Sequence, residues 1–357
     1  MIKILHTADW HLDAPMSGHS PEGTQYLQRE LKKLPQKIVK LATAENCDLI
    51  LISGDLFDGS GRSESLSLVQ NAFGQTNIPI VISPGNHDHI NPASPYLAEG
   101  WPENVHIFQS GAIDSFVPAG LDCCIYGAGY QSMDCPALLK NFHADAPQAW
   151  KIGVLHAEAD TLTSPYCPIT KEQIRASGLD YLALGHVHKG SSLRAENTLC
   201  AWPGSPMGHG FDELGAKGVI LVSLDQQVSA SFLPLDTPRF YDEEVDAIND
   251  PQEAVAAVLP TLPTEDFYRI TLTGYQSDMD LGALYAAFSH IPNLTLRDQT
   301  RPTPDLWDTA EEDSLEGALF ALLKTAAESD SSTLAQRAQL AARICRQLLD
   351  GQEVKLP

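Results

Sequence analysis

Five short polar segments each follow a predicted strand of branched apolar residues, and this pattern constrains the fold more than any other feature. They are Asp9-Trp10-His11, Gly54-Asp55-Leu56-Phe57-Asp58, Gly85-Asn86-His87-Asp88, the single His156, and Gly185-His186-Val187-His188. Because the carboxyl ends of strands meet at one edge of an open α/β sheet, we expect these side chains to converge. Aspartate, asparagine and histidine together form the mixed oxygen and nitrogen ligand set that borderline divalent metals take.

The strands that precede these segments predict a layered α/β fold. Apolar runs at 2–6, 48–53, 78–83, 123–126, 152–155, 181–184, 218–224 and 229–233 mostly lack polar alternation, so they should be buried on both faces. Between the first two, Leu27 to Leu41 form a helical stripe of leucine and isoleucine. Pro35 either interrupts that helix or opens a second one, and the sequence leaves both open.

The charge balance is strongly acidic and uneven. The chain of 357 residues has a net charge of −23, and residues 241–357 alone carry 21 acidic and 8 basic groups. A balance of this sign predicts poor non-specific affinity for nucleic acid, so residues 1–240 should handle any anionic substrate. Arg29, Lys33, Lys37 and Lys40 form a basic helix face there. Such a face is more often simply solvated, and contact with a DNA backbone is the alternative.

Composition suggests three parts and a reducing compartment. We predict a domain at 1–237, a smaller α+β cap at 238–300, and a linker with terminal helices at 301–357, with an acidic boundary patch at 242–246. Seven cysteines without a CxxC pair predict a cytoplasmic location. The longest apolar runs are strand-sized, so no membrane association is expected. The chain lacks a G-x-S-x-G or GK[ST] motif, which argues against nucleophilic-serine and P-loop chemistry.

Taken in order, the five segments resemble the calcineurin-like metallophosphoesterase superfamily pattern of DxH, GDxxD, GNHD, a lone His and GHxH. The resemblance implies a four-layer αββα sandwich with a binuclear metal site. One ion would be held by Asp9, His11 and His188, the other by Asn86, His156 and His186, with Asp55 bridging both. His87 would face the scissile phosphate, and Asp88 would orient His87. A metal-bridging hydroxide would then attack the phosphodiester. Asp58 would be either a carboxylate behind the ligands or a helix cap.

A narrower resemblance is to the SbcD/YhaO-type DNA repair exonucleases. It rests on the opening Ile4-Leu5-His6-Thr7-Ala8-Asp9-Trp10-His11-Leu12, on Gly54–Asp58, and on Trp202-Pro203-Gly204-Ser205-Pro206. It implies a Mn²⁺-dependent DNA exonuclease or endonuclease acting in repair, with Fe²⁺ or Zn²⁺ as other metals. It also implies an SMC-like coiled-coil ATPase partner bound through the C-terminal helices, and a homodimer stays open. The alternatives are a phosphoesterase for small phosphodiesters or phosphomonoesters, and a non-catalytic scaffold.

Overall fold

The computed structural model describes residues 1–16, 19–159, 161, 163–248, 250–276, 279–302, 305–349 and 351. The chain divides into two compact units. The first comprises Met1–Asp242, Leu262–Arg269 and His290–Thr295, and the second contains the rest. The boundaries expected at residues 237 and 300 stay predictions. Of the expected terminal segment, residues 303–304, 350 and 352–357 lie outside the described residues.

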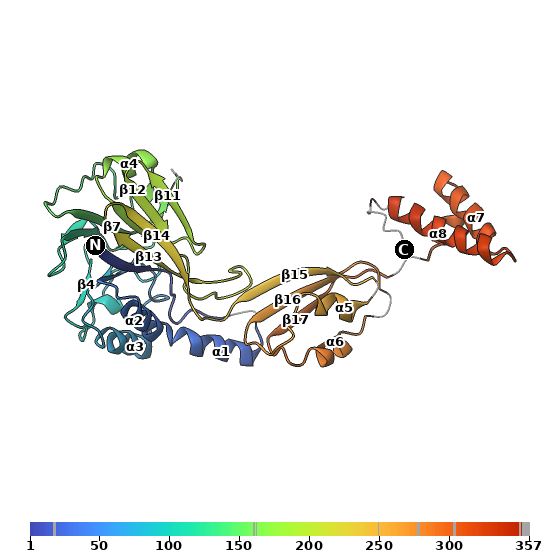
Figure 1. The fold of residues 1–357 in the computed structure, drawn as a ribbon, viewed down its shortest axis with the longest axis horizontal. Coiled ribbons are helices and arrows are strands. Elements are labelled where there is room, and N and C mark those ends of the chain that lie inside the picture. The colour runs from blue at the N-terminus through green and yellow to red at the C-terminus, as the bar shows by residue number, and fades with distance from the viewer. Residues whose placement is uncertain are drawn as a thin grey trace. The chain divides into compact units, whose positions relative to one another are not determined.

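Two six-stranded sheets form the centre of the first unit (Figure 1). The first has the order β14-β13-β1-β2-β3-β4 and the second β11-β12-β10-β7-β6-β5. The first sheet consists of β1 (Ile2–Thr7), β2 (Leu49–Ile52), β3 (Ile80–Ile82), β4 (Val105–Ile107), β13 (Gly218–Leu224) and β14 (Val228–Pro234). The second consists of β5 (Asp114–Phe116), β6 (Cys123–Gly127), β7 (Trp150–His156), β10 (Tyr181–Gly185), β11 (Ser191–Ala195) and β12 (Thr198–Trp202). A short pair, β8 (Glu158–Ala159) and β9 (Pro168–Ile169), follows β7.

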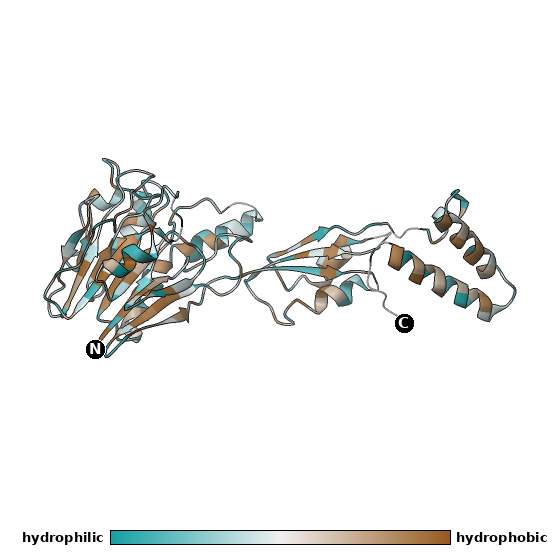
Figure 2. Cartoon of the chain, turned by 90° about the horizontal axis from the view of Figure 1, so that it is seen from above, coloured by the Kyte–Doolittle hydropathy of each residue, from teal (hydrophilic) through white to brown (hydrophobic). Residues whose placement is uncertain are grey.

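The two faces of a central strand pack into two different hydrophobic cores, one under the helices and one between the sheets. This explains why the central strands lack polar alternation. In β2, Ile50 and Ile52 pack with the helices, whereas Leu49 and Leu51 face the other sheet. The helix layer contains α1 (Pro21–Leu31), α2 (Leu34–Ala44) and α3 (Ser63–Phe73). A third core lies on the outer side of the second sheet with α4 (Lys171–Ala176). Figure 2 shows the sheet strands mostly in the hydrophobic colour. The predicted αββα sandwich is confirmed.

The helical stripe at 27–41 belongs to two helices. Pro35 lies in the first turn of α2, a position where its missing N–H costs no helix hydrogen bond. Leu27, Leu31, Leu34 and Ile38 are all buried, so the stripe faces the core as the spacing indicates. Pro35 therefore opens a second helix, which decides the choice that the sequence left open.

The C-terminal part contains a three-stranded sheet of order β15-β16-β17. Its elements are β15 (Phe240–Asp246), α5 (Pro251–Ala256), β16 (Phe267–Thr273), α6 (Leu281–Ala287) and β17 (Leu294–Asp298). The acidic patch at 242–246 lies within β15, where Arg269 pairs with Asp242. The first compact unit ends its long segment at Asp242, within this patch.

The last two helices are α7 (Leu315–Ala327) and α8 (Ser332–Leu349), which follow a short 3₁₀ turn at Asp308–Glu311; another such turn lies at Pro95–Leu97. Phe320 is fully buried, and the guanidinium of Arg346 on α8 lies 4.5 Å from the centre of its ring. Leu315, Leu322 and Leu348 remain exposed. Among the described helices, none is long and apolar enough to cross a membrane.

Candidate metal centre

The loops after β1, β2 and β10 turn through backbone conformations that side chains rarely adopt. Asp9, His11, Asp55 and His186 have φ values of 53°, 45°, 51° and 89°. Such positions cost about 1–3 kcal/mol each and gather at functional sites. Close approach is also needed at Gly85, where an added Cβ would lie 2.2 Å from Asp55 Oδ1. The local backbone is therefore organised around these side chains.

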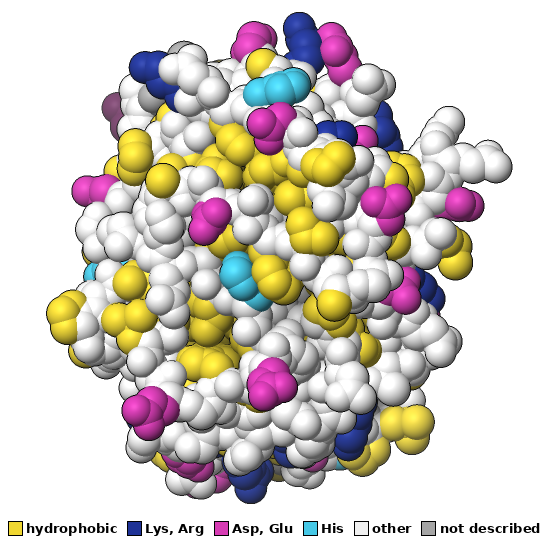
Figure 3. All heavy atoms as spheres, turned by 90° about the vertical axis from the view of Figure 1, so that its left-hand side faces the viewer, with side chains coloured by type: hydrophobic (Ala, Val, Ile, Leu, Met, Phe, Trp, Pro, Cys, Tyr) yellow, Lys and Arg dark blue, Asp and Glu magenta, His cyan; other side chains and the backbone are white. Residues whose placement is uncertain are grey.

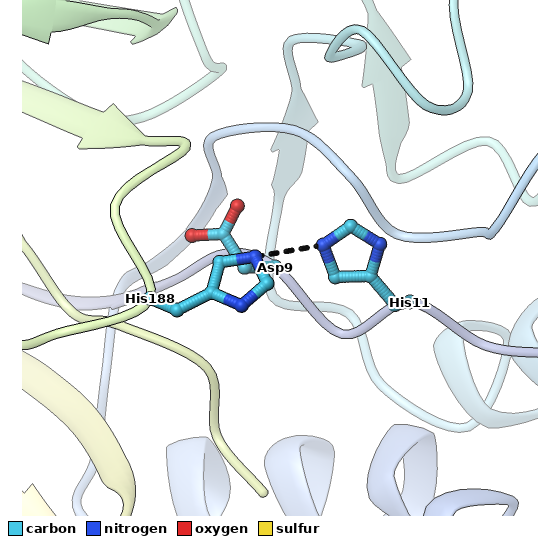
Figure 4. A group of neighbouring side chains, drawn as sticks. All are labelled: Asp9, His11 and His188. Atoms are coloured by element: carbon cyan, nitrogen blue, oxygen red, sulfur yellow. Dashed lines mark hydrogen bonds between the residues drawn. The ribbon is translucent and has the colours of Figure 1, made fainter. Parts of the chain in front are cut away.

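A first cluster joins Asp9, His11 and His188 (Figure 4). His11 Nε2 lies 3.0 Å from His188 Nε2. Burial lowers the pKa of His11 to about 3, so its ring stays neutral. Asp9 Oδ1 accepts a hydrogen bond from the His186 amide at 3.0 Å, while Asp9 Oδ2 is buried without a hydrogen-bond partner among the described residues. Burial raises the pKa of Asp9 to about 6. A cation bound between this oxygen and the two ring nitrogens would satisfy the buried oxygen, which has no other partner in the described part of the chain.

A second cluster joins Asp55, Asn86 and His156. His156 Nδ1 donates to the Ser53 carbonyl at 2.9 Å, which leaves Nε2 as the atom facing the other two side chains. That nitrogen lies 2.9 Å from Asn86 Oδ1 and 3.2 Å from Asp55 Oδ2. Burial opposes a charged ring, but Asp55 outweighs it and raises the pKa of His156 to about 9. Three acceptor atoms therefore converge where only a proton or a metal ion could hold them together.

His186 lies beside this second cluster. Its ring centre is 5.2 Å from that of His156 and 4.5 Å from that of Tyr166. Burial lowers the pKa of His186 to about 4, which keeps the ring neutral at physiological pH. Asp9 and Asp55 come together with His156 in a further group, so the carboxylates link the two clusters. The structure thus gathers all seven residues expected to act as ligands.

Glu213 is a buried carboxylate beside the first cluster that the sequence interpretation missed. Its Oε1 accepts from His188 Nδ1 at 2.7 Å, and its Oε2 accepts from the Ser205 hydroxyl at 2.5 Å. Burial favours the neutral acid, yet the His188 hydrogen bond lowers the pKa of Glu213 to about 2. Because Nδ1 carries the proton, His188 Nε2 presents a lone pair to the first cluster. The sequence analysis singled out Ser205, in the Pro-Gly-Ser loop, but not the glutamate to which it donates.

The expected contact between Asp88 and His87 is wrong. The Asp88 carboxylate accepts from the amides of Gly85, Leu56 and Phe57 and from the Tyr96 hydroxyl, so it holds two loops together. His87 instead places Nδ1 2.9 Å from Asp58 Oδ1. Asp58 does not cap α3, whose N-cap residue is Arg62. The motif puts Asp88 next to His87 in sequence, but the tight turn points the two side chains apart.

The basic face on α1 and α2 is largely neutralised within the chain. Glu30 accepts hydrogen bonds from both Lys33 and Lys37, and Lys37 also donates to the Asp236 carbonyl at 2.6 Å. Arg29 lies 6.0 Å from the centre of the Tyr26 ring, and Lys40 is exposed. Figure 3 shows one face of the protein, where acidic side chains are scattered among apolar ones and basic side chains lie mostly near the edge of the view.

The donor chemistry of the two clusters fits a pair of divalent cations. Buried imidazole nitrogens and carboxylate and amide oxygens face one another, and Asp9 Oδ2 finds no hydrogen bond in the described chain. A divalent ion accepts such lone pairs directly, and histidine with aspartate suits several transition metals. The residues present therefore fit the metals that the sequence pattern implies.

Comparison with known proteins decides the family. The family model for calcineurin-like phosphoesterases matches residues 2–190, more than half of the chain. The chain belongs to the calcineurin-like phosphoesterase family. The match spans all five polar segments and ends just past His188.

Curated relatives include an uncharacterised metallophosphoesterase and named nucleases. The uncharacterised metallophosphoesterase YhaO of Bacillus subtilis is 36% identical over 239 residues, 62% of this chain and 57% of that protein. The SbcD component of the nuclease SbcCD from Staphylococcus epidermidis is 26% identical over 280 residues, 67% of this chain and 71% of that one. Its Bacillus subtilis counterpart is 27% identical over 267 residues, 62% of this chain and 66% of that one. The match thus covers less than two thirds of YhaO.

Proposed function

We propose that this protein is a metal-dependent phosphodiesterase acting on DNA. The observation that carries the proposal is the convergence of atoms with lone pairs, above all His156 Nε2 with the Asn86 and Asp55 oxygens around it, and the orphaned Asp9 Oδ2. In the proposal, Asp9, His11 and His188 hold one ion, Asn86, His156 and His186 hold the other, and Asp55 is shared. Two bound divalent ions, most simply Mn²⁺ with Fe²⁺ or Zn²⁺ as alternatives, would polarise the phosphate and lower the pKa of a water molecule.

His87 is the proposed catalytic residue. Its side chain is 42% exposed, and Asp58 holds Nδ1, so Nε2 is the ring atom available to substrate. A proton on Nε2 can pass to the leaving oxygen, a contribution of typically about 10²–10⁴-fold. Asp58 would position the ring, and Asp88 would support the loops around Asp55.

DNA as substrate is supported by the similarity to the SbcD components of SbcCD nucleases, which extends beyond the matched family region. The proposed domains follow from it, with the phosphoesterase at 1–237, a cap at 238–300, and a partner-binding segment at 301–357. Exposed Leu315, Leu322 and Leu348 support a coiled-coil ATPase partner for that segment. Leu322→Glu should weaken co-purification with such an ATPase, whereas Leu262→Glu, an exposed site in the other unit, should not.

Small phosphodiesters are the second candidate. The net charge of −23 and the neutralised Lys33 and Lys37 favour it, because long anionic substrates would be repelled away from the metal centre. A third interpretation, a non-catalytic scaffold, conflicts with the complete ligand set.

His87→Asn separates these functions. With Mn²⁺, the wild type should degrade linear duplex DNA, and the variant should lose about 10²-fold in turnover while keeping its metals. The loss should be smaller on bis(p-nitrophenyl) phosphate, whose leaving group needs no proton. His143→Asn is the matched control, because His143 is exposed and its Nδ1 lies 2.8 Å from the Ala176 carbonyl oxygen. Cleavage of small esters but not of DNA by the wild type would overturn the nuclease proposal.

A further inference from the structure

A cavity of about 450 Å³ lies beside His188, within the first unit. We call it the side pocket. It is lined by the β11–β12 hairpin and by β13 and β14, including His188, Lys189, Ser192, Trp202, Lys217 and Phe232. This volume falls in the range of about 300–1,000 Å³ typical of small-molecule sites. Apart from His188, its lining residues hold no place in the metal clusters, so the metal centre alone does not explain the pocket.

Strand register brings the side pocket to the metal-binding edge of the sandwich. β12 runs parallel to β10, with Ala201 opposite Ala183, so Trp202 lies at the level of Leu184 just before the Gly185–His188 loop. β13 runs antiparallel to β1, with Ile220 opposite His6, three residues before Asp9. His188 belongs both to the first cluster and to the pocket wall. A phosphodiester bound at the clusters therefore has one of its ester groups within reach of the pocket.

The lining combines a planar apolar surface with cations and hydroxyls. Phe232, on β14, is 49% exposed although it is aromatic, and it lies opposite Ile220 of β13, another lining residue. Lys189 is exposed at the rim, whereas Lys217 lies 3.6 Å from Glu213 Oε2 and is largely balanced by it. Ser192, which lies opposite Ala201 in the hairpin, adds a hydroxyl.

These groups match a nucleoside attached to phosphate. Aromatic side chains stack on nucleobases regardless of their identity, and lysine contacts the neighbouring phosphates. A methyl or simple alkyl ester would fill neither the aromatic wall nor the hydroxyl-lined rim. We propose that the side pocket binds the nucleoside on one side of the scissile phosphate, with the base against Phe232 and the next phosphate at Lys189. The proposal rests on the phosphodiesterase function and names its substrate class as nucleoside diesters.

Two esters with the same leaving group test the side pocket. Thymidine 5′-(p-nitrophenyl phosphate) carries a nucleoside, and methyl p-nitrophenyl phosphate carries only a methyl group in its place. The wild type should show a lower KM for the nucleoside ester. Phe232→Leu keeps apolar bulk on an exposed strand position and removes the ring. It should raise KM for the nucleoside ester by about 5- to 100-fold, the range set by base stacking, and leave kcat and the methyl ester unchanged.

Direct binding gives a readout that does not depend on turnover. Thymidine 3′,5′-bisphosphate, which carries a phosphate on each side of the nucleoside, is titrated calorimetrically into the metal-free protein. It should bind the wild type, and bind Phe232→Leu and Lys189→Gln more weakly. Val117→Ala, an exposed apolar site on another loop, is the control and should behave as wild type.

Each outcome decides one point. Equal KM values for both esters in the wild type, or unchanged KM and binding in Phe232→Leu and Lys189→Gln, would overturn the side pocket while leaving phosphodiesterase activity intact. A KM rise of the same size on the methyl ester would show general damage and would likewise overturn it. A wild type that hydrolyses neither ester with Mn²⁺ would overturn the phosphodiesterase function itself.

Discussion

Glu213→Gln is the sharpest perturbation of the metal centre, because it changes a charge without touching a ligand. Glutamine keeps the size of the side chain, and its carbonyl oxygen can still accept from His188 Nδ1, while its amide nitrogen can donate to the Ser205 hydroxyl oxygen. It loses the negative charge that stabilises the Nδ1–H tautomer of His188. The change therefore tests whether the hydrogen bond to Glu213 tunes His188 as a ligand.

The structure sets the expected size of the effect. A Glu213 pKa of about 2 in place of 4.5 corresponds to about 3 kcal/mol of preference for the charged form, shared among His188, His209 and Ser205. Loss of a carboxylate behind a metal-binding histidine typically costs about 10- to 100-fold in metal affinity. That loss in affinity equals about 1.4–2.8 kcal/mol, which is less than the total preference of Glu213 for its charged form. We expect Mn²⁺ affinity at the first cluster to fall by this factor.

Isothermal titration calorimetry of the metal-free protein with Mn²⁺ measures this change in affinity. Glu196→Gln is the matched control, since Glu196 lies at the end of β11 in the same sheet region and pairs with Arg175 at the surface. Unchanged Mn²⁺ affinity in Glu213→Gln, with the control also unchanged, would refute the argument that Glu213 orients His188. An equal loss in both variants would attribute the effect to general charge.

Three further perturbations have distinct readouts. Burial lowers the pKa of His6 to about 3, so below pH 6.5 the unfolded chain takes up a proton that the native chain does not, and stability is lost as pH falls. Between pH 7 and 5.5 the wild type should lose about 1 kcal/mol more than His6→Gln in urea unfolding, and parallel slopes would refute this. Gly185→Ala puts a Cβ 1.9 Å from the Ser53 carbonyl that fixes His156, so metal content and Tm should both drop, whereas Gly74→Ala, with only ordinary contacts, should be neutral. Wild-type metal content in Gly185→Ala would argue against close backbone approach as the organising constraint. Asp58→Asn should lower kcat with metal content unchanged, and a loss of metal instead would make Asp58 a ligand.

The sheet edge and its ligands could be predicted because they depend on local, repeated signals. Buried strands such as Leu49–Ile52 lack alternation, and each polar segment directly follows one, so convergence at one edge follows from parallel pairing. The predicted strand Gly218–Leu224 has the bounds of β13. These features need no knowledge of distant contacts.

The remaining parts depend on contacts between residues far apart in sequence. Glu213 reaches His188 across 25 residues, and Asp58 reaches His87 across 29, and neither pairing leaves a periodic trace. Two strands that line the side pocket were missed. β11 is mostly exposed and has no β-branched residue, and β12, although buried, has only Thr198. Strand β15 was missed for a similar reason, since its acidic side chains hide the strand pattern.

We propose that the two clusters form one binuclear site that shares Asp55. Elemental analysis of Mn²⁺-reconstituted protein, after removal of free metal, tests it most directly, with Asp114→Asn on an exposed strand as the control. The wild type and the control should each hold two ions per chain, and Asp55→Asn should lose most of both, because its carboxylate faces His11 at 3.6 Å and His156 at 3.2 Å. Two fully occupied sites in Asp55→Asn, or no stoichiometric metal in the wild type, would contradict a binuclear site that shares Asp55.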